Sequence, residues 1–291
     1  MKKIIDSHHL VGLDYWLSKN KRELEYKNDI TAIKNHNIKA LICPFPSSEN
    51  QLYISENEMI CAYAKNNANN VIPVFALNTN YDESYRCIEE YFKAFDVCGI
   101  VIWPILCDVD LLKLKEDKRF VKLCQEYDFF IYLHVGAGNE KDIKRVEKIG
   151  NYTPQDAIEF AREFSYKKII LGHMLRLSID SLEKASIMDN VVVETSGVSS
   201  QKKWYENEQN VFPSYDAGEL KNMDSKEILE HCVKKMNLED KLVFGSSFPY
   251  SLWWKYDLKD EIGLIEQLDI SEDAKDKILY NNIRKFLKIN F

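Results

Sequence analysis

Several features that define other classes of protein are missing from this 291-residue sequence. No apolar run approaches the roughly 20 residues needed to cross a membrane. The seven cysteines include no C-x-x-C pair, and several lie in apolar segments, which is typical of reduced thiols inside the cell. Met1-Lys2-Lys3 leads directly into a strand-like segment rather than into a signal peptide. These absences predict a cytoplasmic protein that has no membrane partner.

Positive charge is not in excess either. The chain has 39 Lys and Arg residues against 46 Asp and Glu residues, so its net charge is −7, and no basic stripe is visible. Nucleic acid is therefore not an expected partner. The sequence also lacks a glycine-rich phosphate loop, a dinucleotide fingerprint and a serine-centred hydrolase elbow. Nucleotide-dependent enzymes and serine hydrolases of that type are thus disfavoured.

What the sequence does contain is a regular alternation of short apolar runs and amphipathic segments. Each run is nearly continuous in apolar residues, as in a parallel strand that is buried on both faces. The predicted strands cover residues 3–8, 40–43, 71–77, 99–103, 129–134, 168–173, 191–195 and 241–245. Helical patterns with apolar residues every three or four positions separate them.

Three of these helical segments begin with recognisable capping signals. Ser55 and Glu58 have the spacing of a capping box, and so do Asp224 and Glu227. Thr153 precedes Pro154, with Asp156 in the first turn, which is the favoured order at a helix start. Eight strand–helix units, with no internal repeat or linker, predict an α/β protein whose residues 1–291 form one (β/α)8 TIM barrel. A doubly wound sheet is the second interpretation.

Histidines stand at the ends of three predicted strands: His8, His134 and His173. In a barrel of this kind the carboxyl ends of all strands converge on one site. We therefore expect the three imidazoles to share a pocket. His9 points to the other side if the first strand continues, because neighbouring strand residues face opposite ways. Three imidazole nitrogens with one open position form a common catalytic zinc site.

The segments around these histidines carry a family resemblance. They read Asp6-Ser7-His8-His9-Leu10, Leu133-His134, Leu171-Gly172-His173 and Gly245-Ser246-Ser247-Phe248-Pro249. In order and spacing they resemble the amidohydrolase-related branch of the amidohydrolase superfamily, which includes small hydrolases, lactonases and decarboxylases. That branch usually has D-x-H-x-H in the first motif and G-S-D-x-P in the last. The resemblance also implies a (β/α)8 barrel.

Two departures affect the metal site that the resemblance implies. Leu10 stands where the second histidine of the first motif is usual, and Ser247 replaces the usual aspartate. His8 and His134 are retained. We expect His8, His134 and His173 to hold a divalent metal, zinc before others, more weakly than the full ligand set would. Without a metal they would polarise the substrate directly.

Further candidates lie near the predicted strand ends. His173 and Ser247 are candidate catalytic residues, and Glu194 is a candidate base or ligand whose alternative role is to fix a loop. Arg176 could bind a substrate carboxylate through two parallel hydrogen bonds, or it could cap the next helix. Ile100-Val101-Ile102-Trp103-Pro104 replaces the usual V-K-L-H-P, which predicts an apolar wall with an indole. Residues 196–223 are long enough to form a lid.

The first functional hypothesis is a hydrolase that cleaves an amide, lactone or similar C–N or C–O bond in a small molecule. One alternative is a decarboxylase or other C–C lyase of the same family. Another is a barrel that has lost catalysis and binds a ligand or partner. Metal content discriminates the metal-dependent enzymes from the last class, and association into a homo-oligomer is left open by the sequence.

Overall fold

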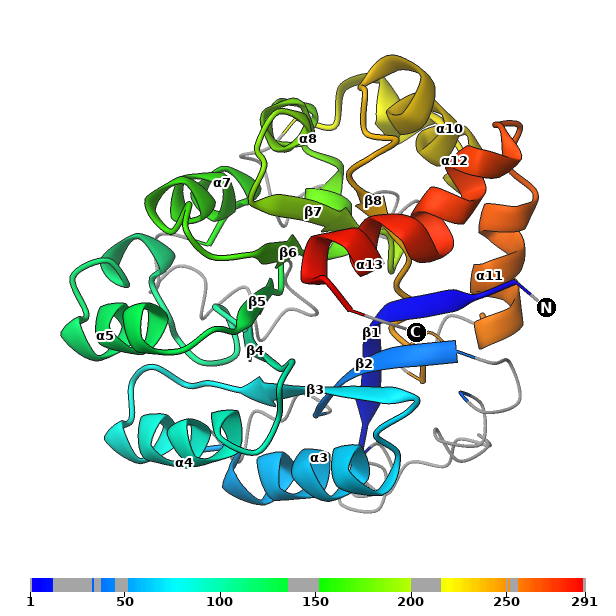
Figure 1. Cartoon of the computed structure of the whole chain (residues 1–291). Coiled ribbons are helices and arrows are strands. Elements are labelled where there is room, and N and C mark those ends of the chain that lie inside the picture. The colour runs from blue at the N-terminus through cyan, green and yellow to red at the C-terminus, as the bar shows by residue number, and fades with distance from the viewer. Residues whose placement is uncertain are drawn as a thin grey trace, which may run out of the picture.

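A computed structural model describes residues 2–12, 33, 38–44, 52–135, 152–199, 216–249, 251 and 256–289. Eight parallel strands follow one another around the sheet in the order of the sequence (Figure 1). They are β1 (Ile4–Val11), β2 (Ile38–Pro44), β3 (Val71–Ala76), β4 (Gly99–Ile102), β5 (Phe130–Leu133), β6 (Ile169–Leu171), β7 (Val191–Glu194) and β8 (Leu242–Val243). The predicted (β/α)8 barrel is confirmed.

Backbone hydrogen bonds between the first and last strand regions close the barrel. Ser7 N–H donates to Phe244 O at 2.8 Å, and Ser247 N–H donates to His8 O at 2.9 Å. The Asp6 carboxylate adds two bonds to the same seam, from Ser246 N–H at 2.9 Å and from the Ser246 hydroxyl at 2.6 Å. β8 is shorter than the predicted 241–245 because the residues after Val243 bond to β1 outside a regular ladder.

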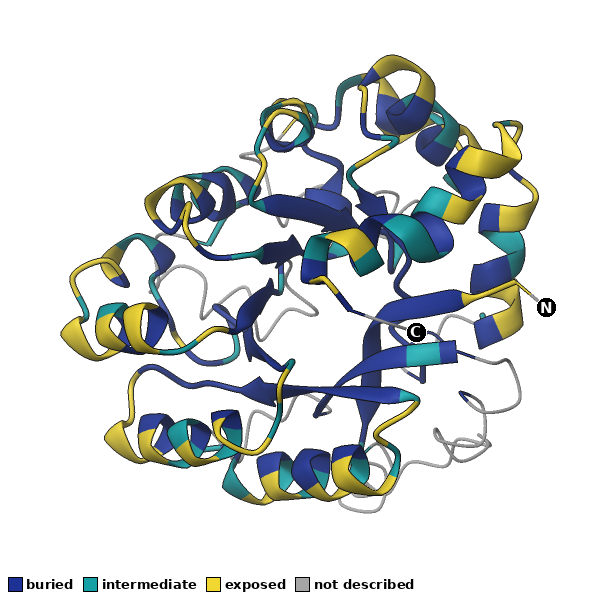
Figure 2. Cartoon of the chain, in the orientation of Figure 1, coloured by how far each residue is buried: buried dark blue, intermediate teal, exposed yellow. Residues whose placement is uncertain are grey.

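Helices surround the barrel and turn one face towards it. They are α3 (Ile54–Asn66), α4 (Asp82–Phe92), α5 (Lys118–Glu126), α7 (Pro154–Glu163), α8 (Ile179–Ser186), α10 (Ser225–Lys235), α11 (Leu258–Glu266), α12 (Glu272–Asp276) and α13 (Asn282–Leu287). Figure 2 shows buried strands inside and exposed residues on the outer helix faces. None of the helices that the structure describes has the length and apolar character that crossing a membrane demands.

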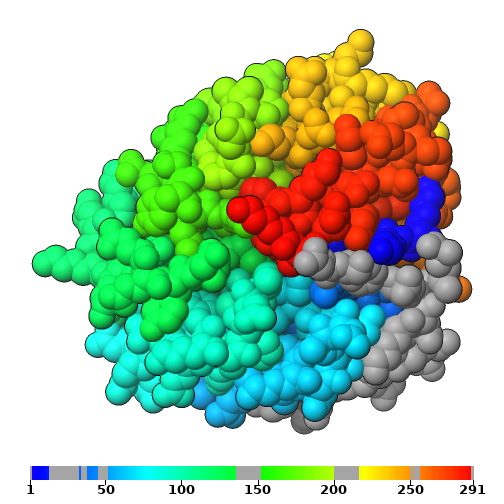
Figure 3. Space-filling view, viewed as in Figure 1, coloured from blue at the N-terminus to red at the C-terminus, as the bar shows by residue number. Residues whose placement is uncertain are grey.

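Short helical segments complete the described chain. They are η1 (Leu111–Lys113), η2 (His173–Leu177), η3 (Gly218–Asn222) and η5 (Lys277–Asn281). The last helices return across one end of the barrel and lie beside the first strand, as the space-filling view shows (Figure 3). Lys2 and Glu272 form an ion pair at 2.8 Å across this contact. Most of the predicted lid, residues 200–215, lies outside the described residues.

Two of the three predicted helix starts are confirmed. Thr153 with Asp156 and Asp224 with Glu227 both form reciprocal capping boxes. The capping box predicted at Ser55 is wrong, because α3 already begins at Ile54, one residue before Ser55, and has no side-chain cap. The buried side chain of Asn57 fixes that end instead, since it bonds both the N–H and the C=O of Ala76 at 2.8 and 2.9 Å.

Candidate functional site

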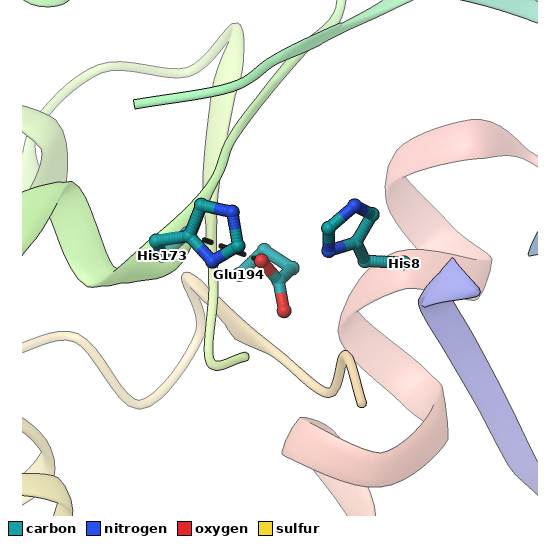
Figure 4. Close-up of side chains that lie close together, drawn as sticks. All are labelled: His8, His173 and Glu194. Atoms are coloured by element: carbon teal, nitrogen blue, oxygen red, sulfur yellow. Dashed lines mark hydrogen bonds between the residues drawn. The ribbon is translucent and has the colours of Figure 1, made fainter. Parts of the chain in front are cut away.

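The three histidines named from the sequence lie close together. His134 directly follows β5, and His173 follows β6 after one glycine. His8 lies inside β1, which continues to Val11 and so is longer than the predicted 3–8. The ring centres of His134 and His173 are 4.5 Å apart, and those of His8 and His173 are 5.2 Å apart. Figure 4 shows His8 and His173 turned towards each other with Glu194 between them.

Glu194, the last residue of β7, is the acceptor at the centre of this group. Its Oε2 atom accepts from the Tyr132 hydroxyl at 2.9 Å, the Ser196 hydroxyl at 2.8 Å and the His173 backbone N–H at 3.1 Å. Its Oε1 atom accepts from Ser196 N–H. Burial raises the pKa of Glu194 to about 7, although these four hydrogen bonds oppose the rise.

Two glycines leave the space that this arrangement occupies. A Cβ atom on Gly245 would lie 1.9 Å from Glu194 Oε1, and one on Gly172 would lie 2.6 Å from the Tyr132 hydroxyl oxygen. Both distances are shorter than real Cβ contacts. The absence of a side chain at these two positions therefore allows β7 and β5 to direct Glu194 and Tyr132 into the barrel.

The Nδ1 atoms of His8 and His173 both face the hydroxyl of Ser196. The distances to Ser196 Oγ are 3.2 Å from His8 and 3.0 Å from His173. His173 Nδ1 also lies 3.3 Å from the carbonyl oxygen of Ser196. Ser247 Oγ lies 2.9 Å from His8 Nδ1, so the serine that replaces the expected aspartate contacts the first-strand histidine.

All three imidazoles are held neutral at neutral pH. Burial, followed by the charges of His173 and His134, places the pKa of His8 well below its usual range. Burial and then Arg176 lower the pKa of His173 to about 4. The pKa of His134 also falls well below its usual range, because of burial first and then of His173 and Arg176. Neutral imidazole is the form that binds a metal ion.

Asp6 and His9 form a separate buried pair in β1. His9 Nδ1 lies 3.0 Å from Asp6 Oδ2, and the His9 ring packs against Phe248 with centres 5.6 Å apart. Asp6 also accepts the His8 backbone N–H at 3.1 Å. His9 is therefore engaged at the seam between the first and last strands, and Asp6 binds the strand ends together.

Arg176 is buried beside the histidines by an unusual turn. Residues 173–177 all have left-handed backbone conformations, with φ between 48° and 59°. Such a conformation costs roughly 1–2 kcal/mol per residue for side chains other than glycine. Arg176 is only 6% exposed, and its charge lowers the pKa of both His134 and His173. The structure thus places this guanidinium near the imidazoles, and backbone strain of this kind concentrates at functional sites.

Trp103 lies at the corresponding end of β4. Val101 is in register with Tyr132, whose hydroxyl reaches Glu194 inside the barrel, so the alternation of side chains places Trp103 on the inner side too. The indole is 1% exposed and packs against the Tyr53 ring with centres 5.1 Å apart. Within the described part of the chain, its Nε1 atom has no hydrogen-bond partner.

One group of these residues could hold a metal ion. His8, His173 and Glu194 each offer one ligand atom, and the three atoms lie within 4.8 Å of one another. His134 is not in this group, although its ring packs edge-on against His173. Among the described residues, the buried Nε2 atom of His8 has no hydrogen-bond partner.

This donor set fits a divalent cation. Two neutral imidazoles and one carboxylate are ligands that zinc and manganese both accept. Glu194 would be the weaker contact, because its two oxygens already accept four hydrogen bonds. His8 and His173 would therefore carry most of the binding.

Ser196 and Tyr132 also belong to this network, although the sequence predicted no role for either residue. Tyr132 stacks on the His8 ring with centres 4.5 Å apart and also bonds Glu194. Both residues are among the most deeply buried in the chain. Tyr132 follows the alternation of β5 two residues before His134, so its inward direction could have been read from the strand period. Nothing local to residues 195–197 indicates the contacts of Ser196.

The comparisons with known proteins agree with the fold and the motifs. The model of the amidohydrolase family matches residues 49–289, so the chain belongs to the amidohydrolase family. The match begins after β1 and β2 and does not include the segment with His8. No curated protein sequence matches the chain.

Solved structures share the whole barrel at low sequence identity. A 5-carboxyvanillate decarboxylase from Sphingomonas paucimobilis has 14% identity and a TM-score of 0.66, with 100% of each chain covered. A dihydroxybenzoic acid decarboxylase from Polaromonas, with bound manganese and an inhibitor, has 15% identity and a TM-score of 0.59, with 100% and 97% covered. A candidate 2-pyrone-4,6-dicarboxylic acid hydrolase from Pseudomonas putida has 13% identity and a TM-score of 0.58, with 100% and 99% covered. At these identities the likeness shows the fold alone.

Proposed function

We propose that this protein is a decarboxylase of small carboxylic acids that acts with a divalent cation. The observation that carries the proposal is the buried Arg176, whose charge acts on the neutral imidazoles of His134 and His173. An arginine in such a place binds carboxylates well, because its planar guanidinium can make two parallel hydrogen bonds to one carboxylate. The substrate is therefore expected to be an anion, and the inward-facing indole of Trp103 suits a planar one.

Decarboxylation fits the acid and base groups better than hydrolysis does. Hydrolysis needs a base that takes a proton from the attacking water. Ser247 is a poor base, and both oxygens of Glu194 already accept hydrogen bonds. Decarboxylation needs no attacking water: the carboxylate leaves as CO2, its bonding electron pair stays on the substrate carbon, and a proton from solvent takes its place. The site must then stabilise the charge left on the substrate.

His8 and His173 would be the main ligands of the cation. Glu194 is the third ligand suggested by the geometry, and His134 is the third ligand expected from the sequence. Zinc or manganese bound there would supply Lewis-acid polarisation of a substrate oxygen. Arg176 orients the anionic substrate, Ser247 holds His8 through its Nδ1 atom, and the inner wall at Trp103 limits the access of water.

Hydrolysis of an amide or lactone is the second candidate, because one observation favours it. A pKa of about 7 is close to the value that suits a general base at neutral pH, and Glu194 has it. Proteins with this fold include both decarboxylases and a candidate hydrolase, so the fold does not choose between the two reactions. The test must therefore measure both.

The experiment incubates the protein with carboxyl-labelled aromatic and aliphatic acids, and separately with lactones and anilides. Each set is run with zinc, with manganese and with a chelator, and labelled CO2 and hydrolysis products are measured. We expect CO2 release that the chelator reduces. Arg176→Gln should raise KM at least tenfold, whereas Arg162→Gln, a surface arginine paired with Glu159 on α7, should leave it unchanged. Hydrolysis without CO2 release would replace the first candidate with the second, and no turnover of any compound would favour a binding function.

A further inference from the structure

We infer that Ser196 is a positioning residue that sets the tautomers of His8 and His173. With its hydroxyl bonded to Glu194, it holds the proton of each imidazole on Nδ1, so that the lone pair of each ring is on Nε2. Ser196 lies outside the set of residues to which the sequence motifs assign a role. Its effect on cation binding rests on the function proposed above, whereas its effect on the tautomers does not.

The hydroxyl of Ser196 contacts the side chain of Tyr132, which is itself bonded to Glu194, and three further polar atoms. Its Oγ atom is 2.8 Å from Glu194 Oε2, 3.0 Å from His173 Nδ1 and 3.2 Å from His8 Nδ1. The residue is completely buried, so the described structure leaves solvent no direct part in these contacts. A single oxygen atom therefore connects the carboxylate of β7 with imidazoles from β1 and from the segment after β6.

Counting protons decides the direction of these three bonds. A serine hydroxyl has one proton to donate and two lone pairs with which to accept. The ionised carboxylate of Glu194 can only accept, and the Tyr132 hydroxyl already donates its proton to it. In this state the Ser196 proton goes to Glu194 Oε2, and the two lone pairs remain for two imidazole N–H groups.

An independent contact gives the same result for His173. Its Nδ1 atom lies 3.3 Å from the carbonyl oxygen of Ser196, and a carbonyl oxygen can only accept. In the neutral ring the proton is thus on Nδ1, and Nε2 carries a lone pair. The side chain and the backbone of one residue fix the same tautomer.

For His8 the decision depends on the hydroxyl of Ser196. Its Nδ1 atom also lies 2.9 Å from the hydroxyl of Ser247, which alone could either donate or accept. Because the proton of Ser196 is engaged by Glu194, Ser196 can only accept from this ring. The His8 Nε2 atom, which is buried and has no hydrogen-bond partner in the described structure, is then a bare acceptor.

The consequence is that the position of the lone pair on each ring is fixed before a cation arrives. Partners that fix the other ring nitrogen of a metal-binding histidine typically change metal affinity by about 10–100-fold. Removal of the Ser196 hydroxyl should therefore weaken cation binding by a similar factor. It should do so although Ser196 itself provides no ligand in this arrangement.

The first test needs only the unmodified protein. Metal-free protein labelled with 15N in histidine is examined by long-range 1H–15N correlation at about pH 9, above the pKa of about 7 of Glu194. The signals of His8 and His173 are assigned with His8→Gln and His173→Gln. We expect a protonated Nδ1 and an unprotonated Nε2 in both rings. A proton on Nε2 of either ring would overturn the inference.

The second test removes the hydroxyl. In Ser196→Ala we expect a mixture of tautomers in at least His8, and a zinc or cobalt dissociation constant raised about 10–100-fold. Ser196→Thr, which keeps the hydroxyl, should restore both properties. Ser181→Ala is the matched control, because Ser181 is equally buried but bonds Ser178 in α8.

A folded Ser196→Ala protein with unchanged tautomers and unchanged affinity would contradict the inference. If this variant does not fold, the spectrum of the unmodified protein decides alone. Tautomers as inferred, together with a protein that releases no CO2 from any acid, would support the role of Ser196 and refute the proposed reaction. The two failures are thus distinguishable.

Discussion

Gly245→Ala tests the placement of Glu194 inside the barrel. The backbone of Gly245 has no left-handed conformation, so alanine can adopt it without strain. The new Cβ atom would lie 1.9 Å from Glu194 Oε1 and 2.5 Å from Cδ, where ordinary contact begins at 3.4 Å. The carboxylate would have to move by about 1.5 Å, the difference between 3.4 and 1.9 Å. Substitution at Gly245 is therefore a direct perturbation of the central acceptor.

The magnitude follows from the hydrogen bonds that such a movement breaks. Glu194 accepts from Ser196 twice and from Tyr132 and His173 once each. A hydrogen bond to a charged group contributes about 1.5–3 kcal/mol, so losing two costs about 3–6 kcal/mol. Total stabilities of domains are about 5–15 kcal/mol, which makes this a large fraction of the free energy of unfolding.

The assay is equilibrium unfolding in urea for the unmodified protein and four variants. Gly245→Ala should lose about 3–6 kcal/mol. In a Glu194→Ala background the same substitution should cost little, because the clashing carboxylate is gone. Gly263→Ala is the matched control: its Cβ atom would meet only Gln267 Nε2 at 3.6 Å, and alanine inside α11 should stabilise by up to about 1 kcal/mol. A loss below about 1 kcal/mol for Gly245→Ala, or equal losses in both backgrounds, would refute the placement.

Three further predictions concern single side chains. Burial raises the pKa of Glu261 from 4.5 to about 7, although the hydrogen bond from Ser199 opposes the rise. The free energy of unfolding should therefore be highest below pH 4.5 and fall by about 3 kcal/mol as the pH rises to 7. Glu261→Gln should remove this pH dependence in urea unfolding curves recorded from pH 4 to 8. Trp103→Phe should lower the melting temperature by about 2–4 °C, because the smaller ring leaves a cavity beside Tyr53. It should raise KM about threefold to tenfold if substrate accepts the indole N–H; an unchanged KM would exclude that contact. Ser247→Asp should raise metal occupancy. Ser247 Oγ lies 2.9 Å from His8 Nδ1, so a carboxylate at this position would orient the ring by a stronger bond, and the left-handed backbone suits aspartate. Lower stability without metal gain would favour a metal-free site.

Local patterns were sufficient for the framework of the fold. Continuous apolar runs marked all eight strands, and the boxes at Thr153 and Asp224 marked helix starts, because each signal depends on residues a few positions apart. The capping box predicted at Ser55 does not form, because a contact between distant residues decides that helix start. There the deciding contact is between Asn57 and Ala76 of another element, and it outweighs the local capping signal.

The histidines could be placed on one site from the sequence because the barrel brings all carboxyl ends of its strands together. The sequence did not predict the direction of each side chain within that site. The left-handed turn at residues 173–177 buries Arg176 beside two histidines, although local sequence equally allowed a helix cap. Ser196 and Glu194 act together through contacts with segments far away in the chain.

The order of the strands, the family motifs and the replacement of two expected ligands by Leu10 and Ser247 can all be read from the amino-acid sequence. The fold adds the four donors to Glu194, the position of Ser196 between both imidazoles and the space at Gly245. These contacts could not be read locally, because hydrogen-bond partners at the strand ends are separated by as many as 240 residues and strand register and packing set their geometry. The secondary-structure propensities of single residues do not describe such contacts.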